Sequence, residues 1–374
     1  MNRFVKRYLI DAMSGMAQGL FASLLVGTII RTLGQQLLRT GDNPVFRFLV
    51  DAGTFCCDAH VVGAAMAVGI GFSMGVHALV LFSLITVGAT ANILGKAGGP
   101  LAVLIIAIIA AEAGMLVSRK TKVDILVTPI VTICSGVLCA VLFAGYIGKA
   151  ADWVGKLIMM TTEMHPFVMG IFVSVVVGIA LTLPISSAAI CAALGLTGLA
   201  GGAAVAGCCA QMVGFAVLSF KENGWGGVLS QGLGTSMLQM PNIIKNPRVW
   251  IAPIVTSAVT GPLATCLFGM TMNGAPVSSG MGTCGLVGQI GVITGWVSPS
   301  DAAVKWAVHK AEKAGMAADA VARITQDSIA VNPGVWQWAG LVLICFVLPA
   351  LLCWAQGKLY RRNGWIKDGD LLLS

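Results

Sequence analysis

Long apolar segments of helical length follow one another along most of this sequence, for example from Ala12 to Leu33 and from Leu101 to Ser118. Of the 374 residues, 57% are hydrophobic and only 10% are charged. A soluble domain carries roughly 25% charged residues, so this chain has too little polar surface to face water on all sides. The apolar runs lack a two-residue alternation, which excludes a transmembrane barrel. We expect an all-α integral membrane protein with about ten membrane segments.

One short sequence motif, Pro-Ile/Val-Ser-Ser followed by Gly-Leu-Thr/Val-Gly, occurs twice within the apolar regions. Proline removes a backbone donor, glycine loosens a helix, and paired serines supply hydroxyls, so each copy predicts a broken helix or a re-entrant hairpin. Broken segments at matching places in two halves of a chain are typical of a transporter's substrate site and are compatible with an inverted repeat. The copies are Pro184-Ile185-Ser186-Ser187 with Gly195-Leu196-Thr197-Gly198, and Pro276-Val277-Ser278-Ser279 with Gly285-Leu286-Val287-Gly288.

The formal net charge is +8, but the basic residues stand in short clusters between apolar runs. This distribution is the positive-inside signal of membrane proteins, and it argues against a nucleic-acid partner. We therefore expect the clusters, and with them both ends of the chain, to lie in the cytoplasm. They are Arg3, Lys6 and Arg7; Arg119, Lys120 and Lys122; Lys245 and Arg248; and Lys358, Arg361, Arg362 and Lys367.

We expect a single transmembrane transporter domain over residues 1–374. The polar stretch 228–244 does not suit a span that faces lipid, so it either lines a cavity or lies on the surface. Two interfacial helices are expected at 34–58 and 148–165. The predicted parts are a first helical half with interfacial helices (12–165), a repeat-bearing core (166–296), an amphipathic connecting segment (297–333), a last span (334–356) and a cytoplasmic tail (357–374).

Glu112 is the most unusual side chain, because it lies inside the apolar run from Leu101 to Ser118. A carboxylate in a span is costly and usually faces a cavity or a charged partner. Three roles are open for it: carrying a proton, accepting a hydrogen bond from a solute, or reaching the nearby basic residues Arg119 and Lys120.

Two histidines, His60 and His77, flank a glycine-rich break in the apolar segment 61–97, and Asn92 lies near the end of that segment. Histidine titrates near neutral pH, so His60 is a candidate for proton coupling or solute binding, and His77, with Asn92, is a candidate for solute binding. The alternative is that each histidine is a structural residue with satisfied hydrogen bonds.

Neutral polar residues surround both repeat copies. Hydroxyls and amides suit multidentate hydrogen bonding with an uncharged polar solute, although the same groups commonly hold membrane helices together. The predicted solute-binding set from this region is Ser186, Ser187, Gln211, Asn273, Ser278, Ser279 and Gln289.

The sequence lacks the signatures of common enzymes and metal sites. Its 11 cysteines include no C-x-x-C and no Cys/His spacing suited to zinc. A P-loop and an H-E-x-x-H motif are also absent from the sequence. We therefore expect no metal, no cofactor and no catalytic residue.

Three stretches resemble the EIIC-like membrane proteins, which stand beside the sugar permeases of the phosphotransferase system and include proteins labelled toxin regulators after the perfringolysin regulator of clostridia. The resemblance covers most of the chain. The stretches are Leu183-Pro184-Ile185-Ser186-Ser187-Ala188-Ala189-Ile190, Met272-Asn273-Gly274-Ala275-Pro276-Val277-Ser278-Ser279-Gly280-Met281-Gly282 and Asn332-Pro333-Gly334-Val335-Trp336-Gln337-Trp338.

The resemblance implies an all-helical permease in the bacterial inner membrane that forms a homodimer, is surrounded by lipid and moves a small polar solute, with a sugar as the default. Sugar permeases of that system hold the sugar with a histidine and a glutamate. This chain has no Gly-Ile-Thr-Glu-Pro-like stretch, and its second copy carries serines and Asn273 where a carboxylate would be expected. Residues after Gly357 are too few for a phosphorylatable domain, so phosphoryl transfer would fall to separate subunits.

The sequence thus favours a transporter that works by alternating access, with the two broken segments around a central site. Two alternatives stay open: a membrane ligand sensor of the toxin-regulator type, and an ion-coupled carrier of a small organic anion. A channel is disfavoured, because cation pores generally show rings of charge or carbonyl filters.

Overall fold

The computed structural model describes residues 4–39, 41–313 and 315–373, and Arg3 of the first basic cluster lies outside them. Within these ranges the regular elements are helices, and one isolated antiparallel bridge joins Gly198 to Met272. Six of the described helical segments are long and apolar enough to cross a membrane, or seven if one bent pair counts as a span, and two further apolar helices are shorter. The prediction of an all-α membrane protein is confirmed.

The first long helix contains α1 (Ala12–Leu20) and α2 (Val26–Leu38). The next two helices, α3 (Pro44–Cys56) and α4 (Ala59–Ser73), are bent by 58° relative to each other and run back along α2 and α1. Glycines allow this close approach, because a Cβ on Gly15 would lie 2.1 Å from the carbonyl oxygen of Gly69. The expected interfacial helix at 34–58 therefore corresponds to α3, which packs along α2.

Four further helices complete the N-terminal part: α5 (Ala78–Gly95), α6 (Gly99–Val117), α7 (Asp124–Cys139) and α8 (Gly145–Thr161). The predicted break in segment 61–97 falls at Gly75, whose φ is 67°. The chain reverses again at Lys96, so α5 and α6 pack as an antiparallel pair. The chain does not reverse between α7 and α8, which form one long helix from Asp124 to Thr161. Most of the segment 148–165, expected to be a separate interfacial helix, is therefore the end of this long helix.

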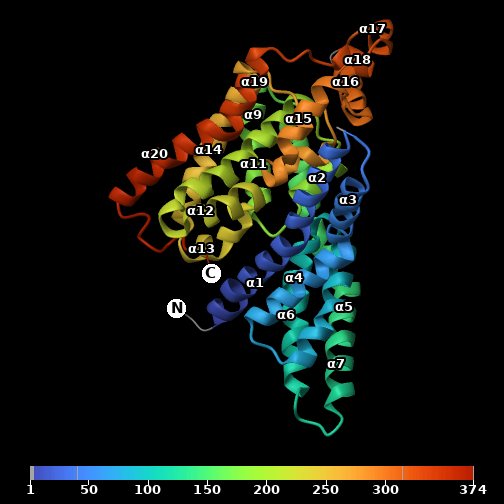
Figure 1. Cartoon of the computed structure of the whole chain (residues 1–374), viewed down its shortest axis with the longest axis vertical. Coiled ribbons are helices and arrows are strands. Elements are labelled where there is room, and N and C mark those ends of the chain that lie inside the picture. The colour runs from blue at the N-terminus through green and yellow to red at the C-terminus, as the bar shows by residue number, and fades with distance from the viewer. Residues whose placement is uncertain (1–3, 40, 314, 374) are drawn as a thin grey trace.

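The second half is built around α11 (Gly198–Leu218), which is buried over almost its whole length. It is covered by α9 (Pro166–Thr182), α14 (Ile251–Pro262) and α20 (Leu348–Arg362), the last of which continues α19 (Val335–Val342). Figure 1 shows two bundles: α4 to α7 extend downward, and α9, α11, α14 and α20 lie above and to the left. The helix that holds α1 passes between the two bundles and packs on both.

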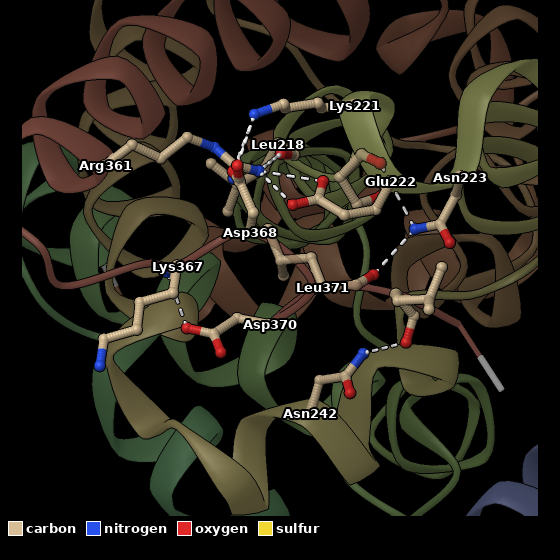
Figure 2. A network of polar contacts seen from close by, with 12 residues as sticks. Leu218, Lys221, Glu222, Asn223, Asn242, Arg361, Lys367, Asp368, Asp370 and Leu371 are labelled. Carbon is tan, nitrogen blue, oxygen red and sulfur yellow. Dashed lines mark hydrogen bonds and ion pairs between the residues drawn. The ribbon is translucent and has the colours of Figure 1, made fainter.

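A polar network holds the tail of the chain against α12 (Phe220–Leu229) and α13 (Met240–Lys245), as Figure 2 shows. The amides of Asn223 and Gln239 donate to the carbonyl oxygen of Leu371 at 2.8 and 3.0 Å. Asn242 donates to Leu372 O at 2.9 Å. The side chain of Leu371 is fully buried. Gln239 and Asn242 of the polar stretch 228–244 therefore bind the tail, and residues 234–237 include lining residues of a cavity described below.

Ion pairs surround this tail contact. Arg361 pairs with Glu222 at 2.8 Å, and Lys221 pairs with Asp368 at 2.8 Å. The hydrogen bond from Lys221 lowers the pKa of the Asp368 carboxyl. The two ends of the described chain lie close together in Figure 1, because α13 also packs on the start of the first helix.

The tail contact predicts a clear effect for Asn242→Ala. Asn242 is buried and also donates to Gln239 Oε1 at 2.8 Å, so alanine leaves this buried acceptor and the partly buried carbonyl oxygen of Leu372 without the asparagine donor. We expect a loss of about 1–3 kcal/mol in the free energy of unfolding. Thermal unfolding in detergent measures it, with Asn363→Ala as a control on an exposed asparagine. Equal unfolding temperatures for the two variants would contradict this account of the tail.

Candidate functional site

Both repeat copies interrupt their helices where the sequence predicts it. The first break follows α9, and Ser186 then caps the short helix α10 (Ser187–Ala193) by accepting from the backbone N–H of Ala189 at 3.2 Å. In the second copy an irregular stretch at 268–275 leads into a short 3-10 helix, Pro276–Gly280, and then into α15 (Val287–Val297). Both copies therefore place irregular backbone inside the protein, where neighbouring groups can satisfy it.

The two copies bind directly to each other. Ser187 Oγ donates to the carbonyl oxygen of Gly280 at 2.7 Å, and Ser279 Oγ donates to Leu196 O at 2.7 Å. The backbones of Gly198 and Met272 exchange two hydrogen bonds of 3.0 Å. These contacts give Ser187 and Ser279 a structural role, since each hydroxyl donates across the contact between copies.

A cavity of about 330 Å³ lies between the two bundles, beside this contact. Its walls come from the first long helix, the facing ends of α4 and α5, both repeat copies and residues 234–237. The polar side chains that line it are Asn92, Lys96, Ser186, Ser187 and Thr235. The structure thus brings together three of the predicted site residues, Asn92, Ser186 and Ser187, and adds two that were not predicted.

Most hydrogen-bonding groups in this cavity already have partners. Asn92 donates to the carbonyl oxygen of Ala59 at 2.8 Å, and Ser187 is bound to Gly280. Ser186 and Thr235 each accept from a backbone N–H, those of Ala189 and Met237. An accepting hydroxyl still has its own proton to donate. The cavity therefore offers donors from Ser186, Thr235 and Lys96.

The other predicted residues near the repeats lie outside this cavity. Gln211 is fully buried and accepts from Trp250 Nε1 at 2.9 Å, which suits the role of holding helices together. Ser278 is buried against Gly291. Gln289 donates to Cys209 Sγ at 3.2 Å.

Asn273 lines a second cavity, of about 550 Å³, with Trp306 and Lys310. Its walls include α16 (Asp301–Lys313), part of the expected amphipathic segment, which continues in α17 (Ala318–Ala322) and α18 (Gln326–Ile329). Burial lowers the pKa of the Lys310 ammonium. Lys310 also donates to the carbonyl oxygen of Thr162 at 2.6 Å, so it fastens this segment to the end of α8.

The three titratable candidates lie elsewhere and do not line the first cavity. His60 pairs with Asp58 at 2.9 Å, and His77 Nδ1 lies 3.0 Å from Ser118 Oγ. Glu112 forms an ion pair with Arg7 at 2.8 Å. It forms no ion pair with Arg119 or Lys120. The nearby basic partner considered for Glu112 was thus the wrong one, because α6 packs beside the start of the first helix and brings Arg7 within reach.

Two buried polar atoms in the repeats have no hydrogen-bond partner among the described residues: Thr197 Oγ1 and Gln289 Oε1. A buried polar group without a hydrogen-bond partner lowers the stability of a fold by about 1–3 kcal/mol, so such groups are rare in native proteins. Thr197 lies near the end of the first copy, and Gln289 directly follows the second. No group of three His, Cys, Asp or Glu side chains in the described part of the chain is placed to hold a metal ion.

A protein-family model described as "Phosphotransferase system, EIIC" matches residues 10–373. The chain belongs to this EIIC family. It is therefore a multi-pass membrane permease component of the phosphotransferase type, as the sequence resemblance implies. No curated protein and no solved structure shows significant similarity to it.

Sequence reasoning missed Lys96 and Thr235 in this EIIC protein. A lysine after an apolar run is typical of an anchor at the end of a span, so Lys96 gave no signal of its own. Thr235 lies in the polar stretch 228–244, for which a cavity-lining role was one of two alternatives. Only the folded chain shows that both face the cavity where the first repeat lies.

Proposed function

We propose that this EIIC permease moves a small polar solute, a sugar or a related compound, and that the 330 Å³ cavity is its solute site. The observation that carries the proposal is that both repeat copies contribute residues to the wall of this cavity. The hydroxyl groups of Ser186 and Thr235 in that wall each keep a proton that can be donated to a solute. A pocket with a few converging polar groups in an otherwise apolar wall is typical of small-molecule sites.

Alternating access is supported by the way the repeat contact separates the two cavities. Ser186, Ser187 and Gly280 line the first cavity, while Gly198, Thr271 and Asn273 line the second. The bonds between the copies lie between these sets of residues. We propose that rocking of one bundle against the other loosens the contact and connects each cavity in turn with its own side of the membrane. The unpaired atoms of Thr197 and Gln289 support a second arrangement in which they find partners.

Phosphoryl transfer is assigned to separate subunits of the phosphotransferase system, so this chain is not proposed to be an enzyme by itself. We place it in the bacterial inner (plasma) membrane with both ends in the cytoplasm, which agrees with the way the two ends of the described chain lie close together in Figure 1. The helix Asp124–Thr161 has a largely exposed apolar surface. That surface suits membrane lipid and the proposed homodimer.

Removing the two free hydroxyls tests the solute site. We expect Ser186→Ala with Thr235→Val to weaken binding of the stabilising solute at least tenfold, since two hydrogen bonds of about 1 kcal/mol each are lost. A panel of sugars and polyols is screened on purified protein by the rise in unfolding temperature that each causes. Asn43→Ala is the control, because it removes a helix cap of the same kind on α3, away from the cavity. An unchanged affinity in the double variant would remove this cavity from the transport route.

A further inference from the structure

We propose that Lys96 binds a negatively charged group on the solute, so that the cavity selects an acidic sugar or a related anion over a neutral sugar. This inference rests on the proposed function, because it names the solute class for the same cavity. It starts from the position of Lys96 in the turn between α5 and α6, at the wall that faces the first repeat.

The turn that carries Lys96 is held firmly in place. Its next residue, Ala97, accepts a hydrogen bond of 2.9 Å from the backbone N–H of Ser186. On the other side, a Cβ on Gly98 would lie 2.8 Å from the Cα of Gly148. The turn that holds Lys96 is therefore fixed against the backbone of Ser186, and both residues line the same cavity.

Lys96 is the charged residue among those that line this cavity. The lining residues include no acidic side chain, and the Lys96 side chain makes no ion pair or hydrogen bond with any described residue. Its ammonium group is therefore available to a ligand. By contrast, Arg7, Lys221 and Arg361 all pair with carboxylates of the protein.

The backbone at Lys96 is strained for a residue with a side chain. Its φ and ψ are 51° and −125°, a region that glycine enters readily and other residues avoid. Strain of this kind costs of order 1–3 kcal/mol and is often found at functional sites. The neighbouring positions 95, 98 and 99 are glycines, whereas the strained position holds a lysine. The strain thus supports a function for the side chain at this position.

The free groups of the cavity also favour an anion. Lysine contributes three donors and no acceptor, and the hydroxyls of Ser186 and Thr235 each keep one proton to donate. One N–H of the Asn92 amide is used by Ala59 O, and its second N–H is a further donor. Hydrogen bonds between an ammonium group and a carboxylate or phosphate are stronger than those between neutral groups. A solute rich in acceptors, with one negative group at Lys96, matches this set.

The test compares matched solutes on purified protein without any phosphoryl donor. Each hexose of a panel (glucose, galactose and mannose) is compared with its uronic acid and its 6-phosphate. The rise in unfolding temperature that each compound causes is measured first, and its dissociation constant is then measured by titration. We expect an anionic member to bind best, and Lys96→Gln to weaken its binding by about 10- to 100-fold, the effect of losing a charged hydrogen bond. Lys96→Arg should keep most of the affinity.

Two further variants separate binding from folding. Lys96→Gly removes both the charge and the backbone strain, so it should unfold at a temperature no lower than the wild type and still lose the anion. Lys120→Gln changes an exposed lysine of another loop and should bind normally. Preference for the uronic acid identifies a carboxylate as the natural group, and preference for the 6-phosphate identifies a phosphoryl group.

Tight binding of a neutral hexose that is unchanged in Lys96→Gln would overturn this inference and leave the proposed function standing. Binding of no member of the panel to the wild type would overturn the proposed sugar site and the inference together.

Discussion

Gly280→Ala is expected to abolish solute binding and uptake, because it forces the two repeat copies apart. A Cβ at this position would lie 2.5 Å from the carbonyl oxygen of Ser187, 2.6 Å from its carbonyl carbon and 2.7 Å from the backbone nitrogen of Ala188. All three are backbone atoms, so no side-chain rotation can relieve the overlap. We expect a loss of about 1–3 kcal/mol in the free energy of unfolding from overpacking, together with the loss of the solute-induced rise in unfolding temperature.

Gly145→Ala is the matched control for this variant. Gly145 has helical backbone angles, φ −63° and ψ −37°, and no atom lies within 4 Å of a Cβ placed there. Alanine in a helix is more favourable than glycine by about 0.5–1 kcal/mol, so this variant should be slightly more stable and bind normally. Normal solute binding by Gly280→Ala would show that the repeat contact does not shape the site.

Gly207→Ala should have the largest effect on folding. Gly207 lies where α11 crosses α9, and a Cβ there would lie 1.9 Å from Ser174 O and 2.6 Å from Ser174 Cα. Van der Waals packing is the main attraction between membrane helices, and small residues permit it. Separating α9 from α11 would also disturb the hydrogen bond of 2.7 Å from Ser174 Oγ to Ser257 O on α14. We expect destabilisation of more than about 3 kcal/mol.

The measurement is the yield of monodisperse protein after solubilisation, followed by its unfolding temperature. A well-folded Gly207→Ala protein, with an unfolding temperature equal to that of Gly145→Ala, would contradict the close α9–α11 crossing described here.

The breaks in the helices could be predicted from the sequence because their causes are local. Pro184 and Pro276 cannot continue a helical hydrogen-bond pattern, and serines and glycines follow each of them. The same local chemistry predicted a glycine-rich break in segment 61–97, which falls at Gly75, and the all-helical fold. Asn92, Ser186 and Ser187 were singled out on such grounds, and the fold brings them to one cavity.

Contacts across long stretches of sequence could not be predicted, because nothing local specifies them. Ser187 and Gly280 are 93 positions apart, and Glu112 and Arg7 are 105 apart. Glu112 was therefore considered only with basic neighbours in sequence. Lys96 escaped notice for a related reason: its strained backbone and its place opposite Ser186 exist only in the folded chain.

The most direct test of the central claim is counterflow of a labelled solute, chosen from the panel that stabilises the wild type, in proteoliposomes. A carrier with its site between the repeats should exchange the solute across the membrane in wild type and in Gly145→Ala, and should fail to do so in Gly280→Ala. Binding without counterflow in the wild type would instead identify a membrane sensor. Exchange by Gly280→Ala at the wild-type rate would contradict the placement of the solute route at the contact between the two copies.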